Sequence, residues 1–261
     1  MDNLHNQFGL GNMISCGNDE PKYKCDKCKD IGMVEFEQEV DGETHSFWRV
    51  CDCVKAKEAE RKMRSSGLGA VLEAQTFENF KTETELQKAM KQAALNYLDA
   101  LQTGTPWFYI GGNPGSGKTH LCTAICGELL KKGWSVKYMQ WVAEARRLKA
   151  YVNEPDFDNL VDEYITCDAL YIDDLFKMMF SGRPCTPTEA DVKIAFTIFN
   201  ARYLQNKPTI ISSEWDIVGD LLEADEGTFS RVYERSKGHT VTIPRDTANN
   251  YRLRRWSNES R

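Results

Sequence analysis

A glycine-rich segment carries the most recognisable chemistry in this chain of 261 residues. Residues 112–119 read Gly-Asn-Pro-Gly-Ser-Gly-Lys-Thr, the spacing G-x-x-x-x-G-K-T of a phosphate-binding loop. Glycines let successive backbone N–H groups turn towards a phosphate, and a following helix adds the positive end of its dipole. In such a loop the lysine reaches the β- and γ-phosphates, and the threonine hydroxyl binds Mg²⁺. The expected nucleotide contacts are Asn113, Pro114, Gly115, Ser116, Gly117, Lys118, Thr119 and His120.

Two adjacent carboxylates form a second candidate element. Asp173 and Asp174 follow the apolar run 169–172, which has the character of a buried strand. In a parallel sheet the carboxyl ends of the strands face the ligand crevice. We therefore expect Asp173 to join Thr119 in binding Mg²⁺ next to the nucleotide, and Asp174 to orient or activate the attacking water. The alternative for either aspartate is a structural cap of the following turn.

Four of the nine cysteines stand in two close pairs, and these are Cys25, Cys28, Cys51 and Cys53. Between the pairs, residues 33–40 and 44–50 look like strands, and the intervening Asp41-Gly42 is a hairpin signal. A hairpin would bring the four thiolates together as ligands of a tetrahedral Zn²⁺ site. His45 is an alternative ligand, because the second pair is the tight form C-x-C. A redox dithiol is the alternative function, although the chain lacks a thioredoxin-like βαβ context there.

Apolar periodicity predicts the elements that must position these groups. Helices are expected at residues 83–101, 118–132, 142–151, 188–205, 216–222 and 228–235. Strands are expected at residues 107–110, 135–139, 169–172, 209–212 and 240–243. Strands that alternate with helices indicate an α/β fold with a parallel five-stranded sheet covered on both faces. Cys122 and Cys126 fall on the apolar side of helix 118–132, where we expect them to be buried core residues.

Composition divides the chain into four parts. Residues 1–19 are polar and contain glycines, so we expect a flexible N-terminus. Residues 20–64 hold the cysteine module and a connecting helix predicted from residue 55. Residues 65–75 begin with Ser-Ser-Gly and are interpreted as a linker. Residues 76–261 hold the α/β domain.

Charge and hydropathy exclude several classes of protein. The chain has 33 Lys and Arg against 39 Asp and Glu, a formal net charge of −6, so any contact with nucleic acid must be local. No apolar run approaches the roughly 20 residues of a membrane helix. Residues 1–17 lack the order of a signal peptide, and the odd number of cysteines suits reduced thiols. These features predict a cytoplasmic protein with no membrane partner.

The combined motifs resemble the AAA+ helicase-loader family of the DnaC/DnaI type, in a phage- or prophage-like form; the related IstB transposition ATPases share its core. The resemblance covers about residues 20–256. Its carriers are the phosphate loop continuing into His120-Leu121, the two adjacent aspartates, and the segments KPTIISSE (207–214), FSRVYER (229–235) and NYRL (250–253). The resemblance implies a P-loop AAA+ domain preceded by a small zinc-binding β-hairpin module. It also implies that ATP is hydrolysed slowly and used as a switch.

The resemblance assigns roles to residues outside the phosphate loop. A polar sensor touches the γ-phosphate side after the fourth strand, and Ser213 and Glu214 occupy that stretch. Arg231 matches the arginine finger that completes the ATP site of a neighbouring subunit, so self-association through the ATP site is expected. Asp174 stands where many AAA+ ATPases have Glu, which affects the expected rate of hydrolysis rather than binding. Arg252 is a candidate second sensor, and a solvated surface charge is the alternative for both arginines.

Two functions are compatible with this resemblance. A helicase loader would hold a replicative helicase and single-stranded DNA in a bacterial or phage-infected cell. An IstB-like transposition helper would bind duplex DNA and a transposase. In the resembled loaders the N-terminal region binds the helicase, and Phe36, Phe47 and Trp48 are candidate contacts unless they form a small core around zinc. Basic and aromatic residues near the C-terminus are candidates for single-strand contact, namely Arg245, Tyr251, Arg252, Arg254, Arg255, Trp256 and Arg261.

Overall fold

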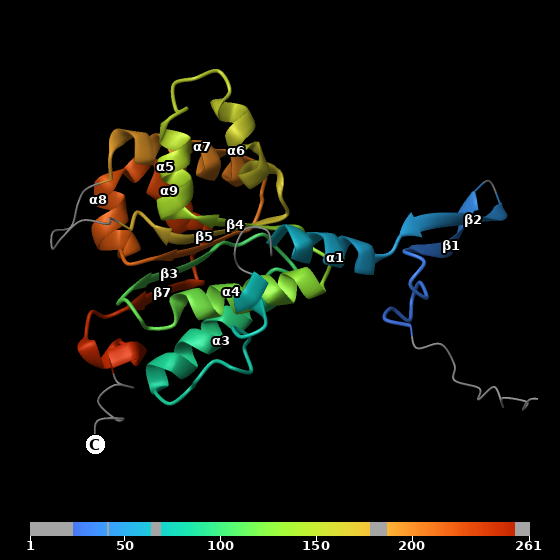
Figure 1. Ribbon diagram of the computed structural model, residues 1–261, viewed down its shortest axis with the longest axis horizontal. Helices are drawn as coiled ribbons and strands as arrows, with labels where there is room; N and C mark the ends of the chain where they lie inside the picture. Colours follow the sequence, from blue (N-terminus) through green and yellow to red (C-terminus); the bar gives the residue numbers. More distant parts are fainter. Residues whose placement is uncertain (1–22, 41, 64–68, 178–186, 254–261) are drawn as a thin grey trace, which may run out of the picture. The chain divides into compact units, whose positions relative to one another are not determined.

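Two compact units make up the structure (Figure 1), a computed structural model that describes residues 23–40, 42–63, 69–177 and 187–253. The first unit is Met1–Cys51 and the second is Asp52–Arg261. The expected flexible segment 1–19 and the C-terminal residues from Arg254 onward lie outside the described residues. The division of the chain into module, linker and ATPase domain stays a prediction.

The described part of the first unit contains the predicted hairpin. Strand β1 (Met33–Val40) pairs with strand β2 (Glu43–Val50) in antiparallel register. Phe36 lies opposite Phe47, and their ring centroids are 5.8 Å apart. Every residue of β2 is exposed, so the hairpin has very little core of its own. A two-stranded sheet of this kind is marginally stable in water and needs an additional constraint.

A parallel five-stranded sheet forms the centre of the second unit, as predicted. Its strands follow the order β4-β5-β6-β3-β7. Their bounds are β3 (Phe108–Gly112), β4 (Val136–Gln140), β5 (Ala169–Leu175), β6 (Thr209–Ser213) and β7 (Thr240–Ile243). The prediction that the third strand stops at Ile172 is wrong, because β5 continues through both aspartates to Leu175, with an irregular register between Ile172 and Leu175.

Helices precede the sheet and alternate with its strands. Their bounds are α1 (Asp52–Met63), α2 (Gly69–Leu72), α3 (Glu85–Ala100), α4 (Lys118–Lys131), α5 (Trp141–Lys149), α6 (Phe157–Thr166), α7 (Glu189–Leu204), α8 (Leu222–Ala224) and α9 (Glu226–Arg235). A π-helical turn (Ile217–Leu221) precedes α8, and a 3-10 turn (Thr247–Asn249) follows β7. Helix α2 lies within the segment interpreted as a linker. Helix α6, which follows Pro155, was not predicted, although Phe157, Val161 and Tyr164 give it a buried face.

Two apolar cores lie on opposite faces of the sheet (Figure 1). Helices α3 and α4 cover one face, where Tyr97, Phe108 and Ile125 are buried. Helices α5, α6, α7 and α9 cover the other face, where Trp107 and Phe199 are buried. No helix among the described residues is both long enough and apolar enough to span a bilayer.

The two scattered cysteines of α4 belong to the first core. Cys122 and Cys126 are fully buried, which confirms the expectation for them. Burial raises the pKa of both thiols. A thiol kept protonated in an apolar environment is a poor nucleophile and a poor metal ligand, so these two residues act as small core side chains.

A buried arginine fixes the sheet at the edge opposite the phosphate loop. Arg202 of α7 is fully buried, and its guanidinium donates to the backbone carbonyls of Tyr164, Cys167 and Pro208 and to the hydroxyl of Thr209. These partners lie at the end of α6 and just before or at the starts of β5 and β6. Because Arg202 ties the beginnings of both strands together, it also sets where their carboxyl ends lie.

Candidate functional site

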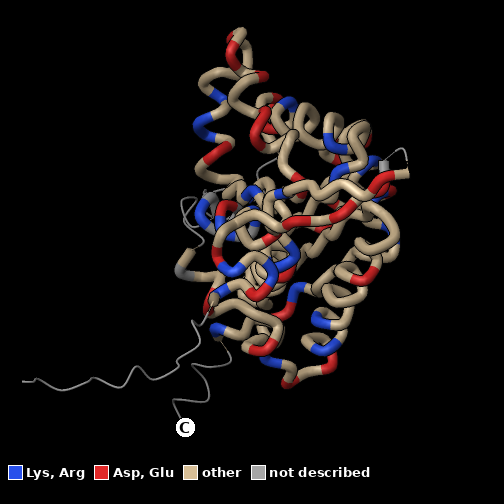
Figure 2. Tube along the Cα trace, turned by 90° about the vertical axis from the view of Figure 1, so that its right-hand side faces the viewer, with Lys and Arg blue, Asp and Glu red and all other residues tan. Residues whose placement is uncertain are grey.

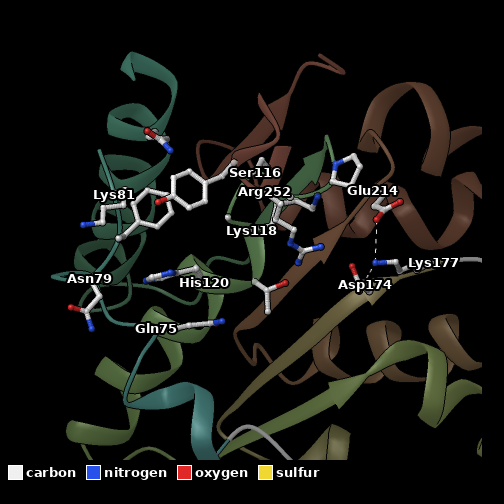
Figure 3. Close-up of a pocket in the computed structure, with 17 residues that line it drawn as sticks. Gln75, Asn79, Lys81, Ser116, Lys118, His120, Asp174, Lys177, Glu214 and Arg252 are labelled. Atoms are coloured by element: carbon white, nitrogen blue, oxygen red, sulfur yellow. Dashed lines mark hydrogen bonds and ion pairs between the residues drawn. The ribbon is translucent and has the colours of Figure 1, made fainter. Parts of the chain in front are cut away.

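The phosphate loop lies between β3 and α4 at the carboxyl edge of the sheet, beside a cavity of about 410 Å³ (Figure 3). The cavity is lined by residues 114–120 of the loop and by the segment that precedes α3. Side chains from the ends of β5 and β6 and from the C-terminal segment complete it. The lining residues outside the loop are Gln75, Asn79, Phe80, Lys81, Gln87, Asp174, Lys177, Glu214, Tyr251 and Arg252. The fold therefore brings the predicted loop and the predicted acidic element to one cavity.

Two glycines of the loop are in contact with other segments of the chain. Gly115 has φ +71°, and a Cβ there would meet the Oδ1 atom of Asn250 at 2.3 Å. Gly117 has φ +98°, and a Cβ there would meet the ring of Phe80 at 2.9 Å. The backbone N–H of Tyr251 donates to the carbonyl of Gly115 at 3.0 Å. Only glycine fits at these points, and the contacts with Phe80 and Asn250 were not predicted.

Lys118 is folded over the loop that precedes it. Its Nζ donates to the carbonyls of Gly112 and Asn113, each at 2.8 Å, and its side chain is buried. Burial lowers the pKa of the Lys118 ammonium. The ammonium therefore lies close to any phosphate that enters the loop. A phosphate would take the place of the two carbonyls as its partner, and a charged acceptor forms a stronger hydrogen bond than a carbonyl does.

Asp173 is the acceptor for four hydroxyl groups. Its Oδ1 accepts from Thr119 at 3.2 Å, from Tyr171 at 2.7 Å and from Ser212, while its Oδ2 accepts from Tyr138 at 3.1 Å. Burial raises the pKa of both tyrosines, with the charge of Asp173 adding to the effect, so both phenols stay protonated and donate. The carboxylate is thus held in one orientation inside the protein.

The hydroxyl of Thr119 and the carboxylate of Asp173 fit a magnesium ion. Both offer hard oxygen ligands, and they already lie within hydrogen-bond distance of one another. Mg²⁺ keeps several waters and takes one or two protein oxygens beside phosphate oxygens, which is what this pair can supply. A bound ion held by Thr119 and Asp173 would neutralise part of the phosphate charge.

Some hydroxyl partners of Asp173 can be predicted from the sequence, and others cannot. Tyr171 lies two positions before Asp173, and side chains two apart share one face of a strand. That spacing could have predicted Tyr171 as a partner of Asp173. Tyr138 and Ser212 belong to the neighbouring strands β4 and β6, so only the strand order brings them to Asp173.

Asp174 lies in a bent part of β5 and faces the cavity. Its φ is +56°, and its backbone N–H donates to the hydroxyl of Ser212 at 3.1 Å. Its carboxylate pairs with Lys177 at 3.0 Å, and Lys177 also pairs with Glu214 at 3.2 Å (Figure 3). Burial raises the pKa of Asp174, and the neighbouring charge of Asp173 raises it further.

The two sensor candidates occupy different environments. Ser213 is fully buried, donates to the carbonyl of Leu175 at 2.8 Å and accepts from the N–H of Trp215 at 3.1 Å. Glu214 lines the cavity. The structure therefore brings Glu214, and not Ser213, to the nucleotide cavity. A sequence alone could not separate them, since they are adjacent and both are polar.

His120 and Arg252 both reach the cavity. The Nε2 of His120 lies 2.8 Å from the carbonyl of Thr76, and its ring stands edge-on to Phe80 with centroids 5.2 Å apart. His120 therefore joins α4 to the segment that precedes α3. Arg252 is an exposed lining residue, in a position to meet a bound phosphate group.

Arg231 lies outside the cavity of its own chain. It is partly buried on α9, and its guanidinium donates to the carbonyl of Gly227. The guanidinium also lies over two aromatic rings, 5.7 Å from the centroid of Phe196 and 5.9 Å from that of Tyr203. Arg231 is not among the described residues that line the nucleotide cavity.

The four paired cysteines converge, with their Sγ atoms within 4.8 Å of one another. The sulfurs of Cys25 and Cys51 are 3.8 Å apart. Four thiolates at about 2.3 Å from a zinc ion in a tetrahedron lie about 3.8 Å from each other. The donor set and the spacing therefore fit a tetrahedral thiolate site. His45 lies on β2 opposite Gln38 and is not in this group.

Local hydrogen bonds hold the first cysteine pair in place. The carboxylate of Asp30 accepts the backbone N–H of Lys24 at 3.0 Å and that of Cys25 at 3.1 Å. Lys29 and Asp30 both have positive φ, so the chain turns tightly after the pair. The N–H of Cys51 then donates to the carbonyl of Gly32 at 2.8 Å. These bonds bring the two ends of the hairpin together.

Comparison with known sequences identifies relatives along nearly the whole chain. A family model described as IstB-like ATP binding protein matches residues 33–255. Protein YqaM of Bacillus subtilis (strain 168) is 31% identical over 95% of this chain and 91% of its own length. The phage-like element PBSX protein XkdC of the same strain is 30% identical over 87% of this chain and 84% of its own length. The replicative helicase loader DnaC of Escherichia coli (strain K12) is 35% identical over 82 residues, which is 31% of this chain and 34% of DnaC.

Solved structures of replication proteins share the fold. The replication initiator DnaA bound to AMPPCP and single-stranded DNA has a TM-score of 0.54 and 24% identity over 71% of this chain, which spans 54% of that DnaA chain. The DnaC helicase loader has a TM-score of 0.52 and 18% identity, and the match covers 66% of this chain and 96% of that one. The DnaI structure has a TM-score of 0.51 and 20% identity over 65% of this chain and 89% of that one.

The sequence matches and the shared fold agree with the geometry of the cavity. A phosphate loop, an adjacent carboxylate for a metal ion and a parallel sheet in the order β4-β5-β6-β3-β7 occur together in one unit. The chain is an AAA+ ATPase of the DnaC/IstB type and belongs to the family of IstB-like ATP binding proteins.

Proposed function

We propose that this ATPase is an ATP-dependent helicase loader that binds a replicative helicase and single-stranded DNA during replication initiation. The observation that carries the proposal is the combination of an ATP cavity in one compact unit with a separate cysteine-bearing hairpin. The hairpin exposes large apolar side chains, with Phe47 41% and Trp48 59% exposed. Phe47 and Trp48 are adjacent on β2, and Trp is among the residue types that contribute most to protein interfaces. The relation to a replicative helicase loader, DnaC, supports the choice of partner.

The residues of the cavity divide the work of ATP binding and hydrolysis in this proposal. Residues 113–120 hold the phosphates, and Thr119 with Asp173 holds Mg²⁺. Asp174 orients the attacking water, and Glu214 is the sensor on the γ-phosphate side. Arg231 enters the ATP site of a second copy, which is consistent with its position outside the lining of its own cavity. ATP then controls assembly, and the protein acts in the cytoplasm of a bacterial or phage-infected cell.

Contact with single-stranded DNA is local in this proposal. Lys and Arg alternate with Asp and Glu along the chain, and no single basic face stands out in the view of Figure 2. The candidates among the described residues are Arg245, Tyr251 and Arg252. Tyr251 and Arg252 line the nucleotide cavity, so DNA bound there would respond directly to the nucleotide state.

Copurification with a replicative helicase tests this function. We expect the full chain to capture the helicase in the presence of Mg²⁺ and ATP, and a Trp48→Ala variant to capture at least about tenfold less, since an interface aromatic residue contributes about 2 kcal/mol or more. The matched control is Tyr151→Ala, which changes another exposed aromatic residue in the second unit. A chain that captures no helicase under any nucleotide condition would contradict the proposal.

The second candidate function is that of an IstB-like transposition helper. The family model that matches residues 33–255 supports it, because its description is that of IstB-like proteins. This reading requires tight binding to duplex DNA and to a transposase. The two functions separate in one experiment: strong duplex binding without helicase capture favours the helper, and helicase capture with preference for single strands favours the loader.

We also propose that the four grouped cysteines bind one structural Zn²⁺. Reduced protein is expected to contain about one zinc ion per chain, and a Cys28→Ser variant to lose most of it, because a structural zinc site needs all four ligands. Helicase capture should fall with the metal, since the hairpin has almost no core of its own. ATP affinity should stay unchanged, because none of the four cysteines lines the nucleotide cavity.

Metal analysis with two controls decides the zinc prediction. A Cys167→Ser variant changes a cysteine outside the group and should keep the full zinc content. A His45→Ala variant should keep it as well. Wild-type protein that is purified under reducing conditions and contains no zinc would overturn the assignment.

A further inference from the structure

The nucleotide cavity holds a lysine that no phosphate-loop pattern includes. Lys177 lines the cavity just beyond the end of β5. Its Nζ lies 3.0 Å from Asp174 and 3.2 Å from Glu214, so one ammonium joins the ends of β5 and β6 (Figure 3). Its side chain is 38% exposed, which leaves room for movement towards the cavity.

An unusual backbone path presents Lys177 to the cavity. Asp174 and Phe176 both have φ +56°, a conformation that residues other than glycine rarely adopt. Phe176 is buried with its ring against Trp141 and Phe229, at centroid distances of 5.1 and 5.4 Å. The N–H of Lys177 closes the turn by donating to the carbonyl of Asp174 at 2.9 Å. Strained backbone persists where packing holds it, and here it directs Lys177 at the two carboxylates.

The polar side chains at the end of β6 and directly after it, Ser212, Ser213 and Glu214, cannot donate to a phosphate. The hydroxyl of Ser212 donates to Asp173, and that of Ser213 donates to the carbonyl of Leu175. Glu214 is ion-paired, and a carboxylate only accepts hydrogen bonds. The ammonium of Lys177 has three donors and is held by the very residue expected to act as the sensor. A carboxylate sensor therefore needs Lys177 in order to contact a phosphate.

We propose that Lys177 recognises the γ-phosphate of ATP, and that Glu214 and Asp174 hold it in position until ATP binds. This inference rests on the proposed use of the cavity as an ATP switch. In a phosphate loop the amides hold the α- and β-phosphates, and the γ-phosphate lies on the side of the second acidic strand. A γ-phosphate there would meet the two carboxylates that line this end of the cavity, those of Asp174 and Glu214. Lys177 offsets that repulsion, while ADP has no group that needs it.

The proposal predicts a change in selectivity between nucleotides, which is measured without turnover. Titration calorimetry with Mg²⁺ and either AMPPCP or ADP gives the two affinities. A Lys177→Met variant should bind AMPPCP at least about tenfold more weakly and ADP within about twofold of wild type, because one charge-assisted hydrogen bond is lost only for the triphosphate. A Lys88→Met variant is the matched control, since Lys88 is an exposed lysine of α3 that does not line the cavity and should not alter the ratio.

A second substitution tests the donor argument. Adding Glu214→Gln to Lys177→Met should recover at least about threefold of the lost AMPPCP affinity, because the amide both donates a hydrogen bond and removes a repelling charge. If Lys177→Met does not fold, the single variant Glu214→Gln provides the test. An AMPPCP affinity equal to or higher than that of wild type supports the proposal. A loss of affinity for AMPPCP but not for ADP overturns it. The proposal is also overturned if folded Lys177→Met loses equal affinity for AMPPCP and ADP, or loses no affinity for either. The ratio of AMPPCP to ADP affinity does not depend on helicase capture. One of the two proposals can therefore be refuted while the other stands.

Discussion

A Lys118→Ala variant is expected to bind ATP at least about 100-fold more weakly than the wild type while keeping its fold. Hydrogen bonds to charged groups contribute about 1.5–3 kcal/mol each, and about 1.4 kcal/mol corresponds to a factor of ten in affinity. Lys118 can form two such bonds to the phosphates in place of the two it makes to the loop carbonyls. Its loss therefore removes two charge-assisted hydrogen bonds to the phosphates.

The fold should survive this change, because the Lys118 ammonium is costly to bury. Burial lowers its pKa, which means that the folded protein disfavours the charged form at this position. The thermal midpoint without nucleotide should stay within a few degrees of the wild type. At 100 times the wild-type Kd, ATP should stabilise the wild type by about 2.7 kcal/mol and the variant by less than about 0.5 kcal/mol, so the upward shift of the midpoint should nearly disappear.

Nucleotide titration and thermal melting check this prediction together. The control is Lys131→Ala, which removes an exposed lysine from the last turn of the same helix, where it pairs only with Glu128. That variant should bind ATP as the wild type does, since an exposed pair of this kind contributes little. Unchanged ATP affinity in Lys118→Ala would refute the assignment of the phosphate loop.

An Arg231→Ala variant is expected to lose about 1,000-fold in the rate of ATP hydrolysis by the assembled protein, and to bind ATP normally as a single chain. An arginine that enters from a neighbouring subunit stabilises the charge of the transferred phosphoryl group, and such residues are worth about 10³–10⁵ in kcat. Arg231 lies on α9, partly buried and outside the lining of its own cavity, so it is placed to act on a second copy rather than on its own nucleotide.

The aromatic contacts of Arg231 bear on the choice of control. Its guanidinium lies over Phe196 and Tyr203, so truncation also removes cation–π contacts. An Arg231→Lys variant retains the charge but not the planar fork, and should recover only part of the activity. Arg146→Ala removes an exposed arginine from α5 and should leave hydrolysis unchanged.

A mixing experiment shows whether Arg231 acts on another copy. Lys118→Ala supplies an intact Arg231 but no ATP site, and Arg231→Ala supplies an ATP site but no finger. Neither variant alone should hydrolyse ATP, and a mixture should regain a measurable fraction of the wild-type rate. A mixture as inactive as its components, although the two variants co-assemble, would show that Arg231 does not act between copies.

Local sequence patterns were sufficient for the features that depend on neighbours in the chain. The phosphate loop follows from residue types at fixed spacing, because its geometry is made by its own backbone and the helix it opens. The five strands and most helices follow from apolar periodicity over a few residues. The cysteine pairs predicted a common site for the same reason, since the Asp41-Gly42 turn returns the chain to its start.

The limits of those patterns appear at Ile172 and at Ser213. The predicted strand end at Ile172 is wrong because a polar pair normally ends a strand, whereas here Tyr138 and Ser212 supply hydrogen bonds that keep Asp173 inside it. Ser213 and Glu214 are adjacent and polar, and only the direction in which the strand leaves the sheet decides that Glu214 lines the cavity.

The sequence by itself determined that this chain binds a nucleoside triphosphate, which residues form the loop, and which four cysteines converge. These properties are local, because residues within one turn or one hairpin set them. Only the tertiary structure decided what surrounds Asp173, where Arg231 lies and how Lys177 connects Asp174 with Glu214. Those relations depend on the order of the strands in the sheet, which brings together residues that are up to 54 positions apart in the chain.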